Sequence, residues 1–177
     1  MAIEPQVFLC YGRPDKDVAH EIAAEFWRNR IECYNYMSKP VEDRLENEID
    51  HRGYIFATRL FIAILSEESV ARFLVAEELA IANQVATMLA GRLFRAYVSL
   101  LPSARNNSAG QPDLVVLWSN SDGAPSVVSN LLHKMGPEFV ERNQKAWEIN
   151  KNLYAEKWRE LNEKYCPDRQ PTSKIAR

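Results

Sequence analysis

The sequence predicts an α/β protein in which a mostly parallel sheet carries helices on both faces. Residues 59–65 include six consecutive apolar side chains, which is typical of a strand that is covered on both sides. Other short apolar runs of this kind alternate along the chain with amphipathic or alanine-rich stretches that are typical of helices. A sheet built in this way binds its ligands at the carboxyl ends of its strands.

The first strand and the first helix are predicted near the start of the chain. Residues 7–11 are apolar and are followed by a Gly-Arg-Pro turn, which is a signal for the end of a strand. Asp15 is well suited to cap the helix behind that turn. One face of this helix is predicted to be buried, and it consists of Val18, Ala19, Ile22, Ala23 and Phe26.

The remaining elements follow the same alternation. They are a strand at residues 31–36, a loop at 37–40, a helix from Val41 that ends near Gly53 or a little after it, the strand at 59–65, a long helix at 66–89 capped by Ser66, and strands at 93–101 and 114–118 with a loop between them.

A last, long helix is predicted over residues 137–165, with large apolar residues at intervals of three, four and seven. We interpret residues 1–135 as one domain, residues 136–166 as a C-terminal helical extension and residues 167–177 as a flexible tail. The apolar anchors of the extension are Trp147, Tyr154 and Trp158. Two roles stay open for it: packing on its own domain, or binding to other copies of the chain or to a sensor or effector protein.

Composition argues against several kinds of site. A formal net charge of −2 does not suit direct binding of nucleic acid. The six glycines are too widely spaced for a glycine-rich phosphate loop, and the cysteines and histidines lack metal-binding spacing. No apolar run approaches the roughly 20 residues that cross a membrane, and the start of the chain does not resemble a signal peptide. We therefore expect a cytoplasmic protein with no metal site and no membrane segment.

The turn after the first strand is one candidate site. Arg13 is suited to holding a phosphate, and Tyr11 is suited to stacking on a base. The alternative is a turn that only caps the helix. Tyr36 and Lys39 lie in a loop that is interpreted either as a mobile lid or as a plain connection.

Glu78 is the second candidate. Helical spacing places it on one face with Leu74, Ile81 and Val85, so its carboxylate is expected to be partly removed from water. Such a group is suited to proton chemistry or to stabilising an oxocarbenium ion. The alternative is a surface glutamate beside Glu77.

Three segments, in order, resemble Toll/interleukin-1 receptor (TIR) domains. VFLCYGRPD resembles the opening motif V-F-I-S-Y-S-x-x-D, with Cys10 and Gly12 in place of the two serines. NRIECYNYMSKPVEDRLENEID is similar to the second strand, the variable loop and the helix after it. RLFIAILSEES followed by FLVAEELAIA resembles the third strand and the next helix. The resemblance covers residues 5–100 and extends loosely to about residue 135.

The resemblance implies a flavodoxin-like fold with a five-stranded parallel sheet. Members of the family are signalling adaptors or enzymes that cleave the nicotinamide glycosidic bond of NAD. In the enzymes an essential glutamate precedes a leucine on the helix after the third strand, which corresponds here to Glu78, with Glu77 as its neighbouring alternative. Many of these enzymes carry a tryptophan four residues earlier, where this chain has Leu74 beside Phe73. The variable loop usually has a Pro-Gly pair, whereas Val41 follows the proline here.

The implied function is a TIR-domain NAD+ nucleosidase or cyclase that releases nicotinamide and ADP-ribose or a cyclic ADP-ribose. NAD is then the substrate, no further cofactor is needed, and activity depends on self-association, in immune or antiphage defence. Glu78 is the expected catalytic residue. The residues expected to contact NAD are Tyr11, Gly12, Arg13, Tyr36, Lys39, Ser66, Phe73 and Leu74. A catalytically silent interaction module and a nucleoside-processing enzyme of related fold are the alternatives.

Overall fold

The computed structural model describes residues 6–34, 50–100 and 111–165, with side chains for residues 6–34, 53–100 and 111–151. These residues form a five-stranded sheet with the order β2-β1-β3-β4-β5, and all neighbouring strands are parallel. The strands are β1 (Val7–Tyr11), β2 (Cys33–Tyr34), β3 (Leu60–Leu65), β4 (Phe94–Ser99) and β5 (Leu114–Leu117). This order and the parallel pairing confirm the predicted flavodoxin-like α/β fold.

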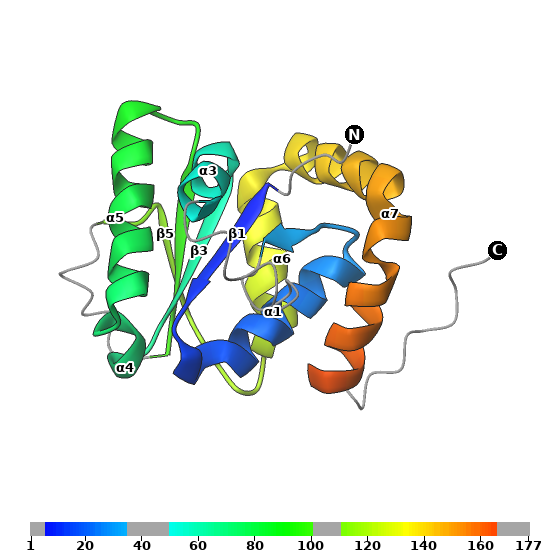
Figure 1. Cartoon of the computed structure of the whole chain (residues 1–177), viewed down its shortest axis with the longest axis horizontal. Helices are drawn as coiled ribbons and strands as arrows, with labels where there is room; N and C mark the ends of the chain where they lie inside the picture. The colour runs from blue at the N-terminus through cyan, green and yellow to red at the C-terminus, as the bar shows by residue number, and fades with distance from the viewer. Residues whose placement is uncertain (1–5, 35–49, 101–110, 166–177) are drawn as a thin grey trace.

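Helices cover both faces of the sheet (Figure 1). On one face lie α3 (Asp50–Ala57) and α5 (Phe73–Met88), and on the other lie α1 (Lys16–Arg28), α6 (Gly123–Met135) and α7 (Pro137–Tyr165). A 3-10 turn, η1 (Arg13–Asp15), precedes α1, and the short helix α4 (Glu67–Val70) precedes α5.

The central strands contribute side chains to two apolar layers, one on each face of the sheet. In β3 every residue from Leu60 to Leu65 is fully buried. Leu60, Ile62 and Ile64 face the layer under α1 and α6, while Phe61, Ala63 and Leu65 face the layer under α3 and α5. Successive side chains of a strand point to opposite faces, so a continuous apolar run is what a strand between two helical layers requires.

The helix predicted over residues 66–89 is in fact two helices. Arg72 has an extended backbone (φ −81°, ψ 130°) and separates α4 from α5. Ser66 does cap α4 as predicted, because its Oγ accepts a hydrogen bond from the Ser69 N–H at 3.2 Å. No glycine or proline lies within residues 66–89, so the sequence pattern predicts one continuous helix there.

The end of α3 agrees with the prediction, whereas α6 was not predicted. A helix was expected to end near Gly53 or a little after it, and α3 ends at Ala57, where the Thr58 hydroxyl donates to the Tyr54 carbonyl at 2.7 Å. The sequence pattern did not predict α6, which ends before Gly136. Gly136 has a φ of 84°, a left-handed value that glycine adopts without steric cost and that ends a helix readily.

The first half of α7 packs on the domain. Trp147 meets Trp27 edge-on, with ring centroids 4.8 Å apart and planes at 87°. Gln144 donates from Nε2 to the Asn29 carbonyl at 3.1 Å, so the end of α1 is also tied to α7. This part of the helix therefore takes the first of its two predicted roles. Tyr154 and Trp158 lie beyond the residues whose side chains are described.

Replacing Trp147 by alanine is expected to destabilise the fold. Trp27 is only 4% exposed, and the variant removes the ring that covers it. Because Trp147 is itself half-buried, we expect a loss of about 2 kcal/mol, below the usual cost for a fully buried tryptophan. Urea unfolding followed by circular dichroism measures the change. Ile149→Ala is the control on the same helix, since Ile149 is 63% exposed and its loss is expected to change stability by less than about 0.5 kcal/mol. Equal stability of the Trp147 variant and the wild type would contradict this packing.

Candidate functional site at the ends of strands β1 and β3

The candidate site lies where the chain leaves β1 and β3. The connection after β1 passes through α1 on one face, and the connection after β3 passes through α5 on the other. In parallel sheets of this order, ligands bind in the crevice that this switch produces. Tyr11 pairs with Ile64 in register, and Ser66 follows the end of β3. The structure therefore brings Tyr11, Gly12, Arg13 and Ser66 to one edge, as predicted from the sequence.

Asp15 ties the two strand ends together. Its side chain is only 5% exposed, and its Oδ2 accepts hydrogen bonds from the Ser66 hydroxyl at 2.9 Å and from the Ser69 hydroxyl. A buried carboxylate is costly unless it is hydrogen-bonded, and the two hydroxyl groups meet that need. The predicted role of Asp15 was wrong in this respect. It stands at the N-cap position of α1, but its side chain makes no capping hydrogen bond.

Gly12 lets the turn after β1 lie directly against α4, because glycine has no side chain. Its φ of −85° is open to any residue, so backbone conformation does not explain the glycine. A Cβ at this position would lie 3.0 Å from Ser69 Cβ and closer still to its Oγ. Only glycine lets the turn after β1 lie directly against α4.

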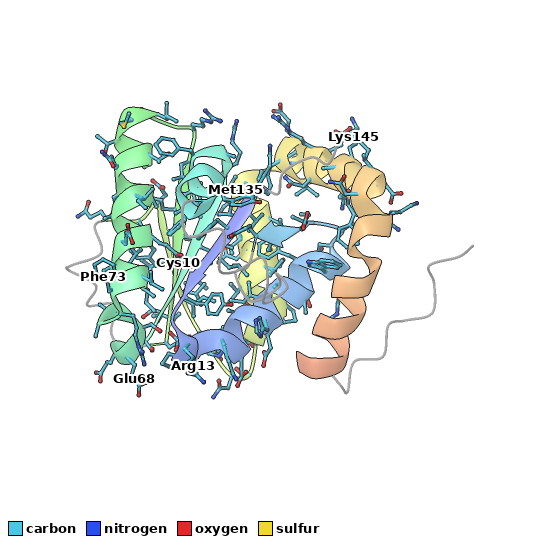
Figure 2. All side chains as sticks on the ribbon, viewed as in Figure 1. Cys10, Arg13, Glu68, Phe73, Met135 and Lys145 are labelled. Carbon is cyan, nitrogen blue, oxygen red and sulfur yellow. The ribbon has the colours of Figure 1, made fainter. Side chains whose placement is uncertain are left out.

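Tyr11 and Arg13 flank Gly12 in different environments. The Tyr11 ring is half-buried and meets the buried His20 edge-on, with centroids 6.0 Å apart, so its position is fixed by packing. Arg13 is exposed. Figure 2 shows Arg13 and Glu68 at the same end of the molecule, where β1 and β3 end. The edge thus combines one fixed aromatic ring with one solvent-accessible cation.

Glu78 lies at the border of the buried face of α5, not in its middle. That face consists of Val75, Leu79, Ala82 and Val85. Leu74, expected to be on the apolar face with Glu78, is 67% exposed. The reason is the break at Arg72, because α5 starts as a separate helix and presents Val75 and Leu79 to the sheet. Glu78 itself is half-buried, as is Glu77.

Cys10 is the neighbour of Glu78 on the sheet. Its thiol donates a hydrogen bond to the Val75 carbonyl oxygen, which lies 4.0 Å from Sγ. Burial raises the pKa of the Cys10 thiol well above its usual value, and the nearby charge of Glu78 raises that pKa further. From the sequence, Cys10 was identified only as the residue that replaces a serine of the TIR motif. Strand alternation could also have shown its position, because it places Cys10 and Phe8 on the same face of the sheet, under α5.

The other predicted contacts are not gathered in the same way. Phe73 is 79% exposed at the start of α5, and Figure 2 shows it on the outer side of that helix. Leu74 is also open to solvent. Tyr36 and Lys39 lie outside the described residues.

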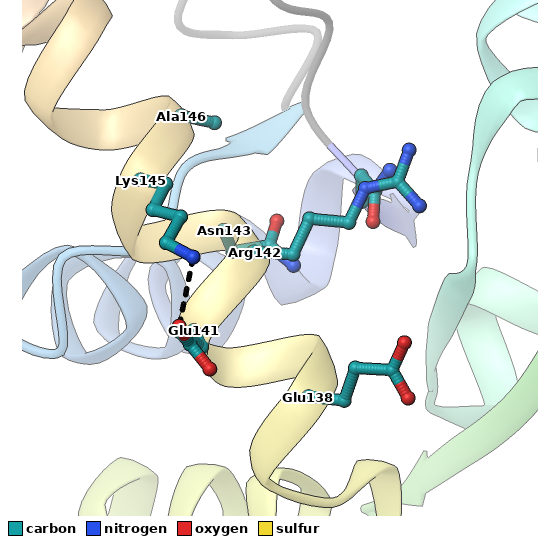
Figure 3. Close-up of a pocket in the computed structure, with 7 residues that line it drawn as sticks. Glu138, Glu141, Arg142, Asn143, Lys145 and Ala146 are labelled. Carbon is teal, nitrogen blue, oxygen red and sulfur yellow. Dashed lines mark ion pairs between the residues drawn. The ribbon is translucent and has the colours of Figure 1, made fainter.

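Two cavities lie elsewhere, along α7. One of about 340 Å³ is lined by Gln6 and by residues at the start of α7, including Glu141 and Lys145, whose side chains form an ion pair at 2.8 Å (Figure 3). The other, of about 700 Å³, lies between α1, α6 and α7. The residues that line them do not include a predicted site residue, so the candidate site is defined by the strand ends.

Within the described ranges, no three His, Cys, Asp or Glu side chains gather closely enough to hold a metal ion. No helix in that part of the chain combines the length and the apolar character needed to cross a membrane.

The sequence matches no model of a known protein family, and no curated protein matches it.

Replacing Gly12 by alanine is expected to disturb the edge that Asp15 holds together. The new methyl group would collide with Ser69, so the turn and α4 must move apart, at a cost of about 1–3 kcal/mol. The same change at Gly53 is the control, because nothing lies within 4 Å of a Cβ there. Gly53 is inside α3, where alanine is expected to stabilise by about 0.5–1 kcal/mol. Thermal unfolding of both variants gives the comparison, and an unchanged midpoint for Gly12→Ala would show that the turn does not lie against Ser69.

Proposed function

We propose that the protein cleaves the bond between nicotinamide and ribose in NAD+, with Glu78 as the catalytic carboxylate. The observation that carries the proposal is a half-buried glutamate on α5, close enough to Cys10 of β1 for its charge to raise the pKa of that thiol, next to the edge where sheets of this order hold nucleotides. The resemblance of the first strand, the third strand and the following helix to TIR domains supports NAD+ as the substrate.

The proposed reaction uses a carboxylate to stabilise positive charge. As the C1′–N bond breaks, its electron pair goes to the pyridinium nitrogen, so nicotinamide leaves as a neutral molecule that needs no proton. The ribose becomes oxocarbenium-like, and a negative charge at Glu78 lowers the energy of that species. Partial burial strengthens the interaction, since it reduces screening by water. Attack on C1′ by water then gives ADP-ribose, and attack by a nitrogen of the adenine gives a cyclic product.

The edge residues are proposed to bind the rest of the dinucleotide. Arg13, which is exposed, suits a bidentate contact with the diphosphate. Tyr11 offers a fixed ring and Gly12 an open backbone at the end of β1. Phe73 and Leu74 are exposed on α5, so the contacts expected between them and the nicotinamide ring remain predictions. Contacts from Tyr36 and Lys39 remain predictions.

Ser66 is better suited to holding the edge than to direct binding. Its hydroxyl already donates to Asp15 and accepts from the Ser69 N–H. A ligand would have to compete with both bonds in order to use it.

The proposed setting follows from the family resemblance. We infer that the activity requires assembly of several copies, that it serves cytoplasmic immune or antiphage defence, and that a sensor or effector protein meets the far end of α7.

A catalytically silent interaction module is the second candidate. The exposure of several large apolar side chains favours it, since such groups often mark protein-binding surfaces. Phe73 and Leu74 are more than half exposed on α5, and Leu117 is 58% exposed on β5.

Glu78→Gln is expected to reduce nicotinamide release by at least about 100-fold, because the amide keeps the shape of the side chain and removes its charge. The assay incubates concentrated protein with NAD+, and in parallel with free nucleosides, and measures the released base by chromatography. Glu68→Gln is the matched control, since Glu68 is exposed on α4 and is expected to change the rate by less than about twofold. Glu77→Gln tests the neighbouring glutamate and is expected to retain more activity than Glu78→Gln.

Three results would contradict the proposal, and each leads to a different conclusion. Equal release by Glu78→Gln and the wild type would remove Glu78 from the reaction. Release of base from nucleosides but not from NAD+ would favour a nucleoside-processing enzyme. Absence of release at concentrations where the protein demonstrably self-associates would favour the interaction module.

A further inference from the structure

We propose that Trp118, at the carboxyl end of β5, stacks on the adenine ring of the bound dinucleotide. The inference rests on the proposed function, and it adds a binding residue for the half of NAD+ that does not react.

Trp118 lies at the same edge of the sheet as the candidate site. It directly follows β5, and its backbone N–H donates to the Ser99 carbonyl of β4 at 2.9 Å. The next residue along, Leu100, donates from its backbone N–H to the Leu65 carbonyl of β3 at 3.0 Å. These bonds connect Trp118 to the strand end that precedes Ser66. Figure 1 shows the connection from β5 to α6 at the end of the molecule where α1 begins.

Trp118 and Tyr11 lie on the same face of that edge. Both are half-buried and pack against the apolar layer under α1 and α6, as does Leu100, which follows β4 between them. β3 and β4 separate β1 from β5, so three strand spacings put β1 and β5 about 14 Å apart. The edge therefore presents two aromatic rings with room for an extended ligand between them.

The proposed positions of the other groups of NAD+ leave the adenine for this end of the edge. The proposed function assigns the nicotinamide to Glu78, on the α5 side, and the diphosphate to Gly12 and Arg13, where β1 ends. Tyr11 directly precedes this pair, so its ring belongs beside the diphosphate. A dinucleotide that extends from there along the edge brings its second base to Trp118.

The turn after β5 holds the indole ring in place. The indole N–H donates to the Asn120 side chain at 3.1 Å, and the hydroxyls of Ser119 and Ser121 are hydrogen-bonded to each other at 2.7 Å. The Gly123 N–H donates to the Ser119 carbonyl at 2.8 Å and closes the turn. Because the indole N–H has its acceptor within the turn, the accessible part of the ring offers an apolar π surface. A ring that is fixed before binding loses little entropy when a base stacks on it.

Two substitutions separate stacking from packing. Trp118→Phe keeps an aromatic ring, whereas Trp118→Leu keeps an apolar side chain against the layer under α6 and removes the ring. Leu117→Ala is the matched control, since Leu117 is the preceding residue, points to the opposite face of the sheet and is 58% exposed. All variants also carry Glu78→Gln, so that nicotinamide compounds are not cleaved during the measurement.

Two mononucleotides test which half of NAD+ meets Trp118. AMP carries the adenine, nicotinamide mononucleotide carries the other base, and NMR titration gives the Kd of each. We expect Trp118→Leu to weaken AMP binding at least about fivefold and to change the Kd of nicotinamide mononucleotide by less than about twofold. Trp118→Phe should retain most of the AMP affinity, and Leu117→Ala should leave both ligands unaffected. Equal AMP affinity in Trp118→Leu and the Leu117 control, or no binding of AMP at millimolar concentration, overturns the proposal.

The indole N–H signal of Trp118 gives a second readout, with the tryptophan still in place. In spectra of 15N-labelled protein it is the indole signal that Trp118→Phe removes. An adenine stacked on the ring adds a ring-current shift, so this signal should move upfield as AMP is added. The indole signal of Trp27, which is 4% exposed on α1, should stay in place.

The two readouts keep the proposals apart. If the wild type releases no nicotinamide from NAD+, the proposed function fails, and the AMP titration still decides whether Trp118 binds adenine. If nicotinamide is released but AMP leaves the Trp118 signal in place, only the present inference is overturned.

Discussion

Asp15 is a buried carboxylate at the end of the sheet where a ligand is expected, and the candidate site depends on the two hydrogen bonds that it accepts. Ser66 and Ser69, which donate those bonds, lie on the far side of the switch between β1 and β3. The bonds hold α4 against Gly12, which must lack a side chain for this contact to form. One carboxylate therefore joins the end of β1, the end of β3 and the first turn after each, and it leaves Arg13 open to solvent.

Glu78 lies on the helix that follows this edge. Ser69 is held at Asp15, the chain turns at Arg72 before α5 begins, and α5 presents Val75 and Leu79 to the sheet. Glu78 follows at the border of that buried face, and its charge raises the pKa of Cys10 on β1. The structure thus gives the carboxylate partial burial, which suits a group that has to stabilise positive charge.

The sequence predicted the features that local patterns determine. The continuous apolar run of β3 identified a strand between two helical layers, and the turn after β1 identified the end of that strand, where ligand binding is proposed. It did not predict the break at Arg72 or the real role of Asp15, because these depend on partners far along the chain. Asp15 is bonded to residues 51 and 54 positions away, and Cys10 contacts a carbonyl 65 positions away. Capping rules and helical periodicity describe near neighbours, so they assigned Asp15 to its own helix and joined α4 to α5.

The most direct test of this account is to locate NAD+ on the protein. Glu78→Gln is suited to the experiment because it is expected to bind the dinucleotide without consuming it, and amide NMR spectra recorded during a titration identify the residues that respond. We expect saturable shifts at Gly12, Arg13 and Ser69 and at the start of α5, with little change at Asn143 and Lys145 beside the α7 cavity. Shifts confined to α7, or no response at millimolar NAD+, would contradict it.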